Sequence, residues 1–519
     1  MHSYPKAQHR FAHTRSHLLL QQVWQQSSQI AVSSLYSLGL CIYRRYFHPL
    51  ARFPGPLLNS VSELPAALSL LRGRFAFDNK LHHERYGDVV RIRPNELTFR
   101  TSQSMQDIYG FRPGHQNMKK SLLHTGPVRV GQTTTLQYVP SDADHGRQRR
   151  ALSHAFSHQA LMDQEPIIQE YMSKVVTRLR RFARDRQAVD ICDWFNYFTF
   201  DTMGDLAFGE SFGCLDEGKY QEWVDMLFMT IKDGTLIQFS RRIGGIGTGA
   251  QTVLARILGV GDAVSYHVHH TRQKVLNRLS MQDIDHRDFI WYILRQKEKG
   301  FELTQDEIIA NAGLFIVAGS ETTANALSGL IARLVWNPRV YEKLVSEIRG
   351  AFHDEAAIDF KAITALPYLN ACIEEILRVH PPVPAGPPRV VPPGGDTVDG
   401  IYIPGGTTVS VGQWSACHSP AHFKTPDEFL PERWIDTAYN DEVKKAVQPF
   451  SAGPRNCIGK NLAYMEMRLV VAQLLWNFDI ASADGAPLWD PAGEMRYKRA
   501  FMVWEEQPLM LHFKDVRCG

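Results

Sequence analysis

The stretch of sequence that decides the fold is Phe450-Ser-Ala-Gly453-Pro-Arg455-Asn-Cys457-Ile-Gly459, followed directly by an apolar helical pattern over residues 462–475. The free N–H groups and the positive dipole end at a helix N-terminus favour a cysteine thiolate over the thiol. Gly453 and Gly459 leave room for a flat ligand beside the backbone, and Arg455 offers a positive charge to a carboxylate on that ligand. These properties suit a loop that supplies an axial thiolate to haem iron.

The ten residues also match every defining position of the haem-binding signature of the cytochrome P450 family, Phe-x-x-Gly-x-Arg-x-Cys-x-Gly, so the chain resembles that family. An isolated cysteine in a glycine-rich turn is usually a buried structural residue, but the complete pattern favours an iron ligand. The resemblance implies a mainly α fold with minor β-sheets (α+β), in which heme b (iron protoporphyrin IX) lies between a long central helix and the cysteine loop. It implies that Cys457 is the axial iron ligand, with Phe450, Gly453, Arg455 and Gly459 around the haem.

Composition and charge exclude several classes of protein. The chain has 519 residues, of which 44% are hydrophobic and 21% charged, enough for an extensive core. Its net charge of +3 is too small to indicate nucleic-acid binding. Its seven cysteines include no C-x-x-C pair, which argues against a disulfide framework or a zinc site. Because no long linker or repeat occurs, we expect residues 57–519 to form one catalytic domain.

The N-terminal region predicts a membrane attachment. Residues 30–43 are mildly apolar, but a bilayer span needs roughly twenty residues. The proline-containing stretch 46–56 resembles the hinge of microsomal family members, so we expect it to be a stiff connector after an anchor or targeting segment over residues 1–45. The implied location is the endoplasmic reticulum membrane, with the catalytic domain in the cytosol. No acidic residue precedes Glu63, which leaves a mitochondrial presequence as the alternative.

Two β regions stand out in a mostly helical sequence. Residues 87–99 alternate in polarity and contain Pro94-Asn95, which predicts a hairpin. Residues 397–411 predict a second β region that turns at Gly405-Gly406. Between helices, the proline-rich run 381–389 predicts a constrained extended loop. The family resemblance implies that residues 383–386 line the substrate pocket and that Arg389 meets a haem propionate.

A long central helix follows from local signals. Thr304-Gln-Asp-Glu307 is a capping box, the apolar pattern continues to Trp336, and Asn337-Pro338 ends it. About 32 residues give a rod of roughly 48 Å, long enough to cross the domain. Polar residues interrupt the apolar run at Asn311, Glu321 and Arg333, which argues against a membrane span.

The middle of this helix reads Ala318-Gly319-Ser320-Glu321-Thr322-Thr323. A threonine inside a helix tends to donate to a carbonyl one turn earlier, and a solvated helix face could carry the same residues. The segment resembles the oxygen-binding groove of the P450 family. That resemblance implies that Thr322 holds water near iron-bound oxygen, that Glu321 relays protons, and that Gly319 leaves space for oxygen.

A charged pair predicts a structural element. Glu375 and Arg378 lie three residues apart on one helix face, a spacing that is also common in surface ion pairs of little value. Pro431-Glu-Arg433-Trp434 follows downstream. Together they resemble the family's Glu-x-x-Arg motif and Pro-Glu-Arg segment, which implies a buried Glu375–Arg378–Arg433 network that supports the cysteine loop.

A further element is Asp144-His145-Gly-Arg-Gln-Arg149-Arg150. Many members of the family have tryptophan where this chain has His145. The resemblance implies that His145 and Arg149 contact haem propionates, whereas a solvated basic helix face is the alternative.

The resemblance extends over residues 46–515 and implies a monooxygenase. Such an enzyme inserts one oxygen atom from O2 into an apolar small molecule, here a terpenoid, polyketide or alkaloid of fungal specialised metabolism. Because the chain has no flavin or nicotinamide fingerprint, its electrons would come from NADPH through NADPH-cytochrome P450 reductase, steered by Arg147, Arg150 and Lys460. An oxygen-independent isomerase or dehydratase is one alternative, against which the Glu321-Thr322 pair argues. A non-catalytic haem-binding protein is the other, for which a polar relay would have no evident purpose.

Overall fold

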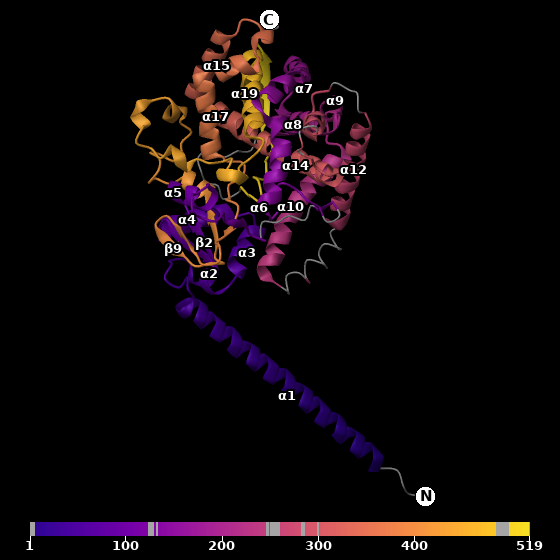
Figure 1. The fold of residues 1–519 in the computed structure, drawn as a ribbon, viewed down its shortest axis with the longest axis vertical. Helices are drawn as coiled ribbons and strands as arrows, with labels where there is room; N and C mark the ends of the chain where they lie inside the picture. The colour runs from indigo at the N-terminus through magenta and orange to yellow at the C-terminus, as the bar shows by residue number, and fades with distance from the viewer. Residues whose placement is uncertain are drawn as a thin grey trace.

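The computed structural model describes residues 6–122, 129–130, 133–244, 249, 260–281, 286–297, 300, 302–483 and 498–517. It shows a mainly helical body with small sheets, from which helix α1 (Lys6–Ile42) projects as a separate rod (Figure 1). The N-terminal half also contains shorter helices, namely α2 (Leu57–Val61), α3 (Leu64–Leu71), α4 (Phe75–Tyr86), α5 (Ser102–Tyr109) and α6 (Asp142–Ser153).

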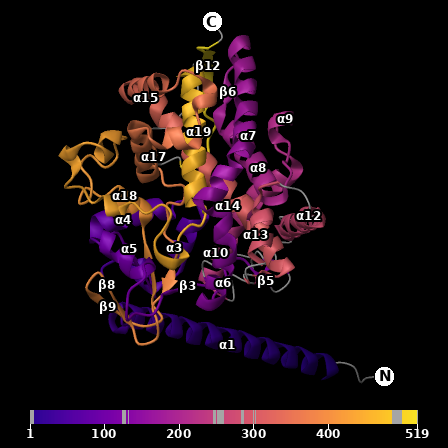
Figure 2. The same cartoon turned by 45° about the horizontal axis from the view of Figure 1, so that its top comes forward.

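Helix α14 (Gln305–Val335) runs through the middle of the body (Figures 1 and 2). Its predicted capping box is confirmed, because Glu307 N–H donates to Thr304 Oγ1 over 3.2 Å and Thr304 N–H donates to Glu307 Oε2 over 2.9 Å. The helix ends before Trp336, and Asn337-Pro338 begins α15 (Pro338–Ala351). The predicted length and ends of the central helix are therefore correct.

The helices around α14 supply most of the core. They are α7 (His158–Asp185), α8 (Ile191–Phe208), α10 (Glu222–Ile243), α12 (Val260–Ser280), α13 (Phe289–Lys297), α17 (Pro367–Val379) and α19 (Lys460–Asn477). Among the described helices, only α14 is long and apolar enough to cross a membrane, but 67% of its most apolar window is buried inside the protein. It is therefore the core helix of this body.

The principal sheet has the strand order β1-β2-β10-β7-β3. The predicted hairpin is confirmed, since β1 (Val89–Arg93) and β2 (Glu96–Phe99) pair antiparallel around Pro94-Asn95. Strand β10 (Thr408–Val411) lies parallel to β2 and antiparallel to β7 (Arg389–Val390), which in turn pairs with β3 (Lys119–Lys120). This sheet thus joins segments from both halves of the chain.

The second predicted β region contains two turns. Strands β8 (Asp396–Val398) and β9 (Ile401–Ile403) form a hairpin around Asp399-Gly400, where both residues have positive φ of 51° and 73°. A β-carbon on Gly405 would lie 2.7 Å from Pro392 O, so Gly405-Gly406 serves a close backbone approach. The predicted turn at Gly405-Gly406 is present, since Thr407 N–H donates to Pro404 O over 3.3 Å, but it does not close a hairpin, because β10 pairs with β2 and β7 and not with β9.

The remaining sheets are small. A three-stranded sheet has the order β11-β12-β6 and consists of β11 (Phe478–Ser482), β12 (Met510–Asp515) and β6 (Val189–Asp190). Strands β4 (Arg129–Val130) and β5 (Thr133–Thr134) form a further pair. Short helices α9 (Cys214–Glu217), α16 (Phe360–Thr364) and α18 (Gln413–Cys417) complete the regular structure.

The segment after α1 is held against the principal sheet. Arg91 N–H donates to Pro54 O over 2.7 Å, and Arg91 Nη1 donates to Arg44 O over 2.9 Å. Leu50 is fully buried. The sheet therefore contributes to holding this connector, in addition to its prolines.

Candidate functional site

The cysteine loop closes on itself directly before α19. Cys457 N–H donates to Phe450 O over 2.9 Å, and Gly459 stands immediately before the first residue of the helix. A β-carbon on Gly459 would meet only the Cys457 sulfur, 4.0 Å away. A β-carbon on Gly453, which has a φ of +71°, would lie 2.0 Å from Tyr109 O. Gly459 therefore leaves space beside the thiol, whereas Gly453 lets the loop pack against the end of α5.

The electrostatics of Cys457 combine opposing effects. The residue is solvent-accessible, but protein packs closely around its sulfur, and this burial raises the pKa of Cys457 above its ordinary value. The Gly459 N–H group and the positive charges of Arg149 and Lys460 oppose that rise. Burial outweighs the helix-terminus effect that the sequence suggested, so the loop by itself favours the thiol. Coordination to a metal ion deprotonates a cysteine in such a position.

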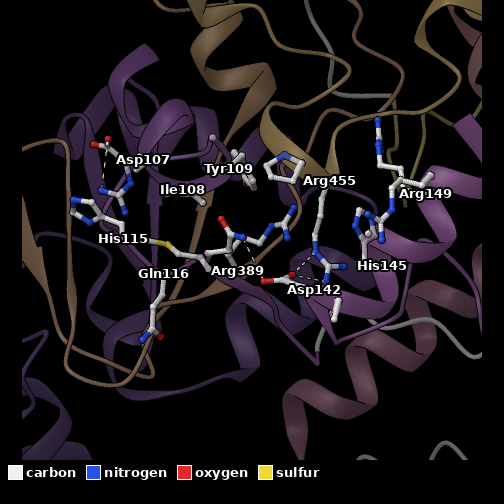
Figure 3. Close-up of a pocket in the computed structure, with 18 of the residues that line it drawn as sticks. Asp107, Ile108, Tyr109, His115, Gln116, Asp142, His145, Arg149, Arg389 and Arg455 are labelled. Carbon is white, nitrogen blue, oxygen red and sulfur yellow. Dashed lines mark hydrogen bonds and ion pairs between the residues drawn. The ribbon is translucent and has the colours of Figure 1, made fainter. Parts of the chain in front are cut away.

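A cavity of about 600 Å³ lies between α5, α6 and the cysteine loop (Figure 3). Four of the residues predicted to bind the cofactor line it, namely His145, Arg149, Arg389 and Arg455. Arg455 Nη2 donates to Asp142 Oδ1 over 2.8 Å, and its Nη1 donates to Val139 O over 2.9 Å. The structure thus brings together residues that are more than 300 positions apart in the chain.

Arg389 indicates which kind of ligand the cavity can bind. It is 2% exposed, and its Nε atom has no hydrogen-bond partner among the described residues. Burial, with repulsion from Arg455, lowers the pKa of Arg389 to about 10, and Tyr109 and the Asp142 carboxylate oppose this shift without forming an ion pair with Arg389 among the described residues. A buried guanidinium without a carboxylate partner is costly. A carboxylate in the cavity would satisfy it, and the propionates of heme b are such groups.

The other two predicted contacts differ from each other. His145 is 5% exposed, and burial together with Arg455, Lys120 and Arg149 lowers its pKa to about 4, so the ring is neutral and can donate one N–H. Arg149 Nη1 donates to Asn456 O over 2.7 Å, and its Nη2 donates to Asn456 Oδ1 over 2.5 Å. In this structure Arg149 therefore holds the cysteine loop while it also borders the cavity.

Lys120 is a residue that sequence reasoning missed. It pairs in register with Arg389 across β3 and β7, and its Nζ donates to Gln137 O. Burial and repulsion from Arg389 and Arg455 lower the pKa of Lys120 to about 6. No motif surrounds this lysine, so only the strand pairing could have revealed it.

The residues of α14 that the sequence predicted to form an oxygen-binding groove, Gly319 to Thr323, contact different neighbours. Thr322 Oγ1 donates to Ala318 O over 2.7 Å, which confirms the predicted bond to the preceding turn. Glu321 and Thr322 are both half-buried, whereas Thr323 is 3% exposed. A β-carbon on Gly319 would lie 2.7 Å from Met203 Cε. The absent side chain of Gly319 therefore makes room for Met203 of α8, and the expectation that it also leaves space for oxygen stays a prediction.

The predicted charged network is completely buried. Arg378 Nε and Nη2 donate to the two oxygens of Glu375 over 2.9 and 2.8 Å, and Arg433 Nε donates to Glu375 Oε1 over 3.2 Å. All three residues have an exposed fraction of 0%. Glu442, which sequence reasoning missed, accepts from Arg433 Nη1 over 2.5 Å and adds a second carboxylate. This geometry excludes an exposed surface ion pair.

The basic residues expected to steer a partner are not equivalent. Arg147 Nη1 donates to Glu307 Oε2 over 3.1 Å, so Arg147 ties α6 to the start of α14. Its role at a partner-binding surface stays a prediction, and its guanidinium group already forms an ion pair with Glu307. Arg150 and Lys460 are exposed, and Lys460 Nζ lies 5.8 Å from the centre of the Phe450 ring in the cysteine loop.

Comparisons with known proteins agree with this site. A family model described as "Cytochrome P450" matches residues 68–510. Cytochrome P450 monooxygenase aba2 of Botryotinia fuckeliana (strain B05.10) is 40% identical over 487 residues, which are 92% of this chain and 92% of that protein. Cytochrome P450 monooxygenase ABA2 of Pyricularia oryzae is 42% identical over 488 residues, 91% of this chain and 93% of that protein.

Similarity extends to a further fungal relative. Cytochrome P450 monooxygenase astA of Talaromyces wortmannii is 37% identical over 490 residues, which are 94% of this chain and 97% of that protein. The family match covers most of the chain and includes the cysteine loop, the central helix and the buried Glu375 network. The chain therefore belongs to the cytochrome P450 family.

Proposed function

We propose that the protein is a haem-thiolate monooxygenase that inserts one oxygen atom from O2 into an apolar small molecule of fungal specialised metabolism. The observation that carries this proposal is the pairing of Cys457, at the start of α19, with a cavity that buries unmatched positive charge. The relatives support the reaction class, since each of the three compared above is named a cytochrome P450 monooxygenase.

The residues present fit heme b. Cys457 would ligate the iron, and Arg389, Arg455 and His145, with Lys120 beside them, would bind the propionates. Glu375, Arg378 and Arg433 would hold the segment that leads to the cysteine loop. Heme b bound through a thiolate supplies an iron centre that activates O2.

Two residues of α14 would handle protons. The Thr322 hydroxyl uses its proton in the bond to Ala318 O, so its oxygen can still accept a hydrogen bond from water. Such a water would be held at the middle of α14, beside Thr322. Glu321, one residue earlier and half-buried, would exchange protons with that water, because a carboxyl group is a suitable general acid and base.

Electrons would come from NADPH through NADPH-cytochrome P450 reductase. The chain itself has no nucleotide-binding fingerprint, so a separate protein must supply them. Arg150 and Lys460 are exposed cations close in sequence to haem-site residues, and they suit an acidic partner surface.

Helix α1 would attach the protein to the endoplasmic reticulum membrane, with the catalytic body in the cytosol. Its described apolar side chains are exposed, among them Trp24, Ile30 and Leu35. The first acidic residue of the chain is Glu63, so the flanking charges of α1 are all basic, as anionic lipids favour. Import into mitochondria is the alternative, and fractionation of cells that express a tagged chain would separate the two.

The reaction type can be tested at Thr322. In haem-loaded protein supplied with reductase and NADPH, Thr322→Ala should bind substrate but lose much of its electron flow to hydrogen peroxide, because the hydroxyl that would hold the proton-delivering water is gone. Thr323→Ala should do less harm to this step, since one residue along a helix points about 100° away. Product should carry label from isotopically labelled O2.

Two results would contradict the proposal. If Thr322→Ala converts NADPH electrons into product as efficiently as the wild-type protein does, Thr322 has no role in proton delivery. Turnover without O2 would instead support the isomerase or dehydratase alternative. A panel of terpenoid, polyketide and alkaloid skeletons, scored by substrate-induced change in the haem spectrum, would identify the substrate class.

A further inference from the structure

An aromatic pair that the proposed reaction does not use joins the start of the cysteine loop to α19. The ring centres of Phe450 and Tyr464 lie 5.3 Å apart, and the ring planes are tilted by 40°. Both residues are half-buried, and such ring contacts add to the stability that burial provides. The Phe450 carbonyl accepts from the Cys457 N–H group over 2.9 Å. Tyr464 therefore contacts the residue that closes the loop around the thiol.

Tyr464 is held in turn by an acid of α17. Its Oη atom donates to Glu374 Oε1 over 2.8 Å, and Glu374 is half-buried. Helices α17 and α19 pack against each other (Figures 1 and 2). Burial raises the pKa of Glu374 above its ordinary value, and the Tyr464 hydroxyl opposes that rise. Because a partly desolvated carboxylate is costly to leave without its donor, this bond fixes the orientation of the Tyr464 ring.

The backbone next to Phe450 is constrained. Ser451 has a φ of +59°, in the left-handed region that residues other than glycine rarely adopt. A residue keeps such a conformation only where its surroundings determine it. Ser451 N–H donates to Gln448 O over 2.9 Å, and the Phe450 ring packs against Tyr464. The contact with Tyr464 therefore helps to hold a turn that is unfavourable by itself.

We propose that Tyr464, aligned by Glu374, is a positioning residue that holds the cysteine loop in place. It acts on Cys457 through Phe450, whose ring packs on Tyr464 and whose carbonyl accepts from the Cys457 N–H group. The next residue of α17, Glu375, belongs to the buried arginine network, so consecutive acids support the loop in two ways. The inference rests on the proposed role of Cys457 as the iron ligand. Because the reduction potential of a haem depends on the surroundings of its ligand, a displaced loop should change that potential.

The test uses two measurements, one of which needs no haem. The first is the reduction potential of the haem-loaded protein. The second is the rate at which iodoacetamide alkylates the solvent-accessible Cys457 in haem-free protein, read from the mass of its peptide. Tyr464→Leu should change both the equilibrium constant of haem reduction and the alkylation rate roughly tenfold, as expected for the loss of one ring contact and one hydrogen bond.

Further variants separate the hydrogen bond from the ring and from the charge. Tyr464→Phe keeps the ring and loses the hydroxyl, so it should change both readouts by only about threefold. Glu374→Leu and Glu374→Gln both lose the charge, but the glutamine oxygen can still accept from the hydroxyl. Glu374→Leu should therefore alkylate as fast as Tyr464→Phe, and Glu374→Gln should alkylate close to the wild-type rate. The double variant Tyr464→Phe/Glu374→Leu should be no worse than either single one, because both changes remove the same contact.

Tyr292→Phe is the matched control. Tyr292 of α13 is also a half-buried tyrosine, and it donates to a half-buried carboxylate, Asp163 Oδ2 of α7, over 2.6 Å. Its loss removes a hydrogen bond of the same kind elsewhere in the body. Tyr292→Phe should leave the reduction potential and the alkylation rate of Cys457 at their wild-type values.

Three outcomes would overturn the inference. They are an unchanged potential and alkylation rate in Tyr464→Leu, equal alkylation rates in Glu374→Gln and Glu374→Leu, and additive effects in the double variant. If Tyr464→Leu does not fold, Tyr464→Phe and the two Glu374 variants still decide, because the phenylalanine change removes only a hydroxyl. The expected alkylation rates in a protein without a thiolate-type carbon monoxide spectrum would support the positioning by Tyr464 and contradict the proposed function.

Discussion

Two regions of this protein bury arginines in opposite ways. In the Glu375 network, Arg378 and Arg433 share one carboxylate, and Glu442 adds another. In the cavity beside the cysteine loop, Arg389 and Arg455 lie near Lys120, and Asp142 is the carboxylate that pairs with Arg455. Arg378 and Arg433 are 0% exposed and Arg389 is 2% exposed, so burial alone does not distinguish the regions.

The balance of charge distinguishes them. Although burial opposes it, Glu375 raises the pKa of Arg378 above its ordinary value, whereas burial and Arg455 lower that of Arg389 to about 10. Buried charges that neutralise one another form a scaffold, which is complete without a ligand. Unmatched buried charge instead identifies the place where an anionic ligand fits.

The largest expected effect is in the scaffold. Glu375→Ala leaves Arg378 and part of Arg433 buried without their shared carboxylate, which should cost about 3–5 kcal/mol of folding free energy. We expect little or no folded, haem-loaded protein, measured by expression yield and by haem absorbance per protein. Normal yield with full haem content would mean that the network is dispensable and that the contrast between the two regions fails.

The second effect is in the cysteine loop. Cys457→Ala should abolish the thiolate-type carbon monoxide difference spectrum of the reduced protein, because no other described cysteine lies in this loop. Cys457→Ser should retain some haem through weak oxygen ligation. The spectrum checks both variants, and their circular dichroism serves as the folding control. A wild-type spectrum in either would assign the iron to another residue.

A smaller effect is expected from the cavity arginine. Arg389→Gln removes a buried cation that has no carboxylate partner, so the free energy of unfolding of haem-free protein should hold or rise. The same change should raise the rate of haem loss roughly tenfold, because a charged hydrogen bond to a propionate is gone. Haem transfer to an acceptor protein measures that rate. If Arg389→Gln lowers the stability of the haem-free protein and leaves the rate of haem loss unchanged, Arg389 is a scaffold residue like Arg378 and Arg433.

The last prediction concerns pH. Burial lowers the pKa of Lys120 from 10.5 to about 6 in the folded chain, so between these values the unfolded chain binds one more proton. The contribution of this group to stability therefore rises with pH across that window and is lost as pH falls toward about 6. Denaturation of haem-free protein at several pH values should show this slope, and Lys120→Met should flatten it. An equal slope in both proteins would place Lys120 in water.

Local sequence signals predicted the elements whose causes are local. The capping box at Thr304, the hairpin at Pro94-Asn95 and the back-bond of Thr322 depend on residues within a few positions of one another, and the structure has all three. The Glu375–Arg378 spacing likewise predicted a pair. The turn expected at Gly405-Gly406 is also present, but it does not close a hairpin, because β10 pairs with β2 and β7, which are distant in the sequence.

By itself, the sequence determined the cysteine loop, the central helix and the family, because each depends on a motif of contiguous residues. Tertiary structure decided which residues meet. Strand pairing places Lys120 beside Arg389, helix packing directs Gly319 toward Met203, and an ion pair to Glu307 ties Arg147 to the start of α14. Burial also decided the charge balance, since it raises the pKa of Cys457 against the helix-terminus effect. Desolvation depends on every neighbouring atom, and no short window of sequence contains those neighbours.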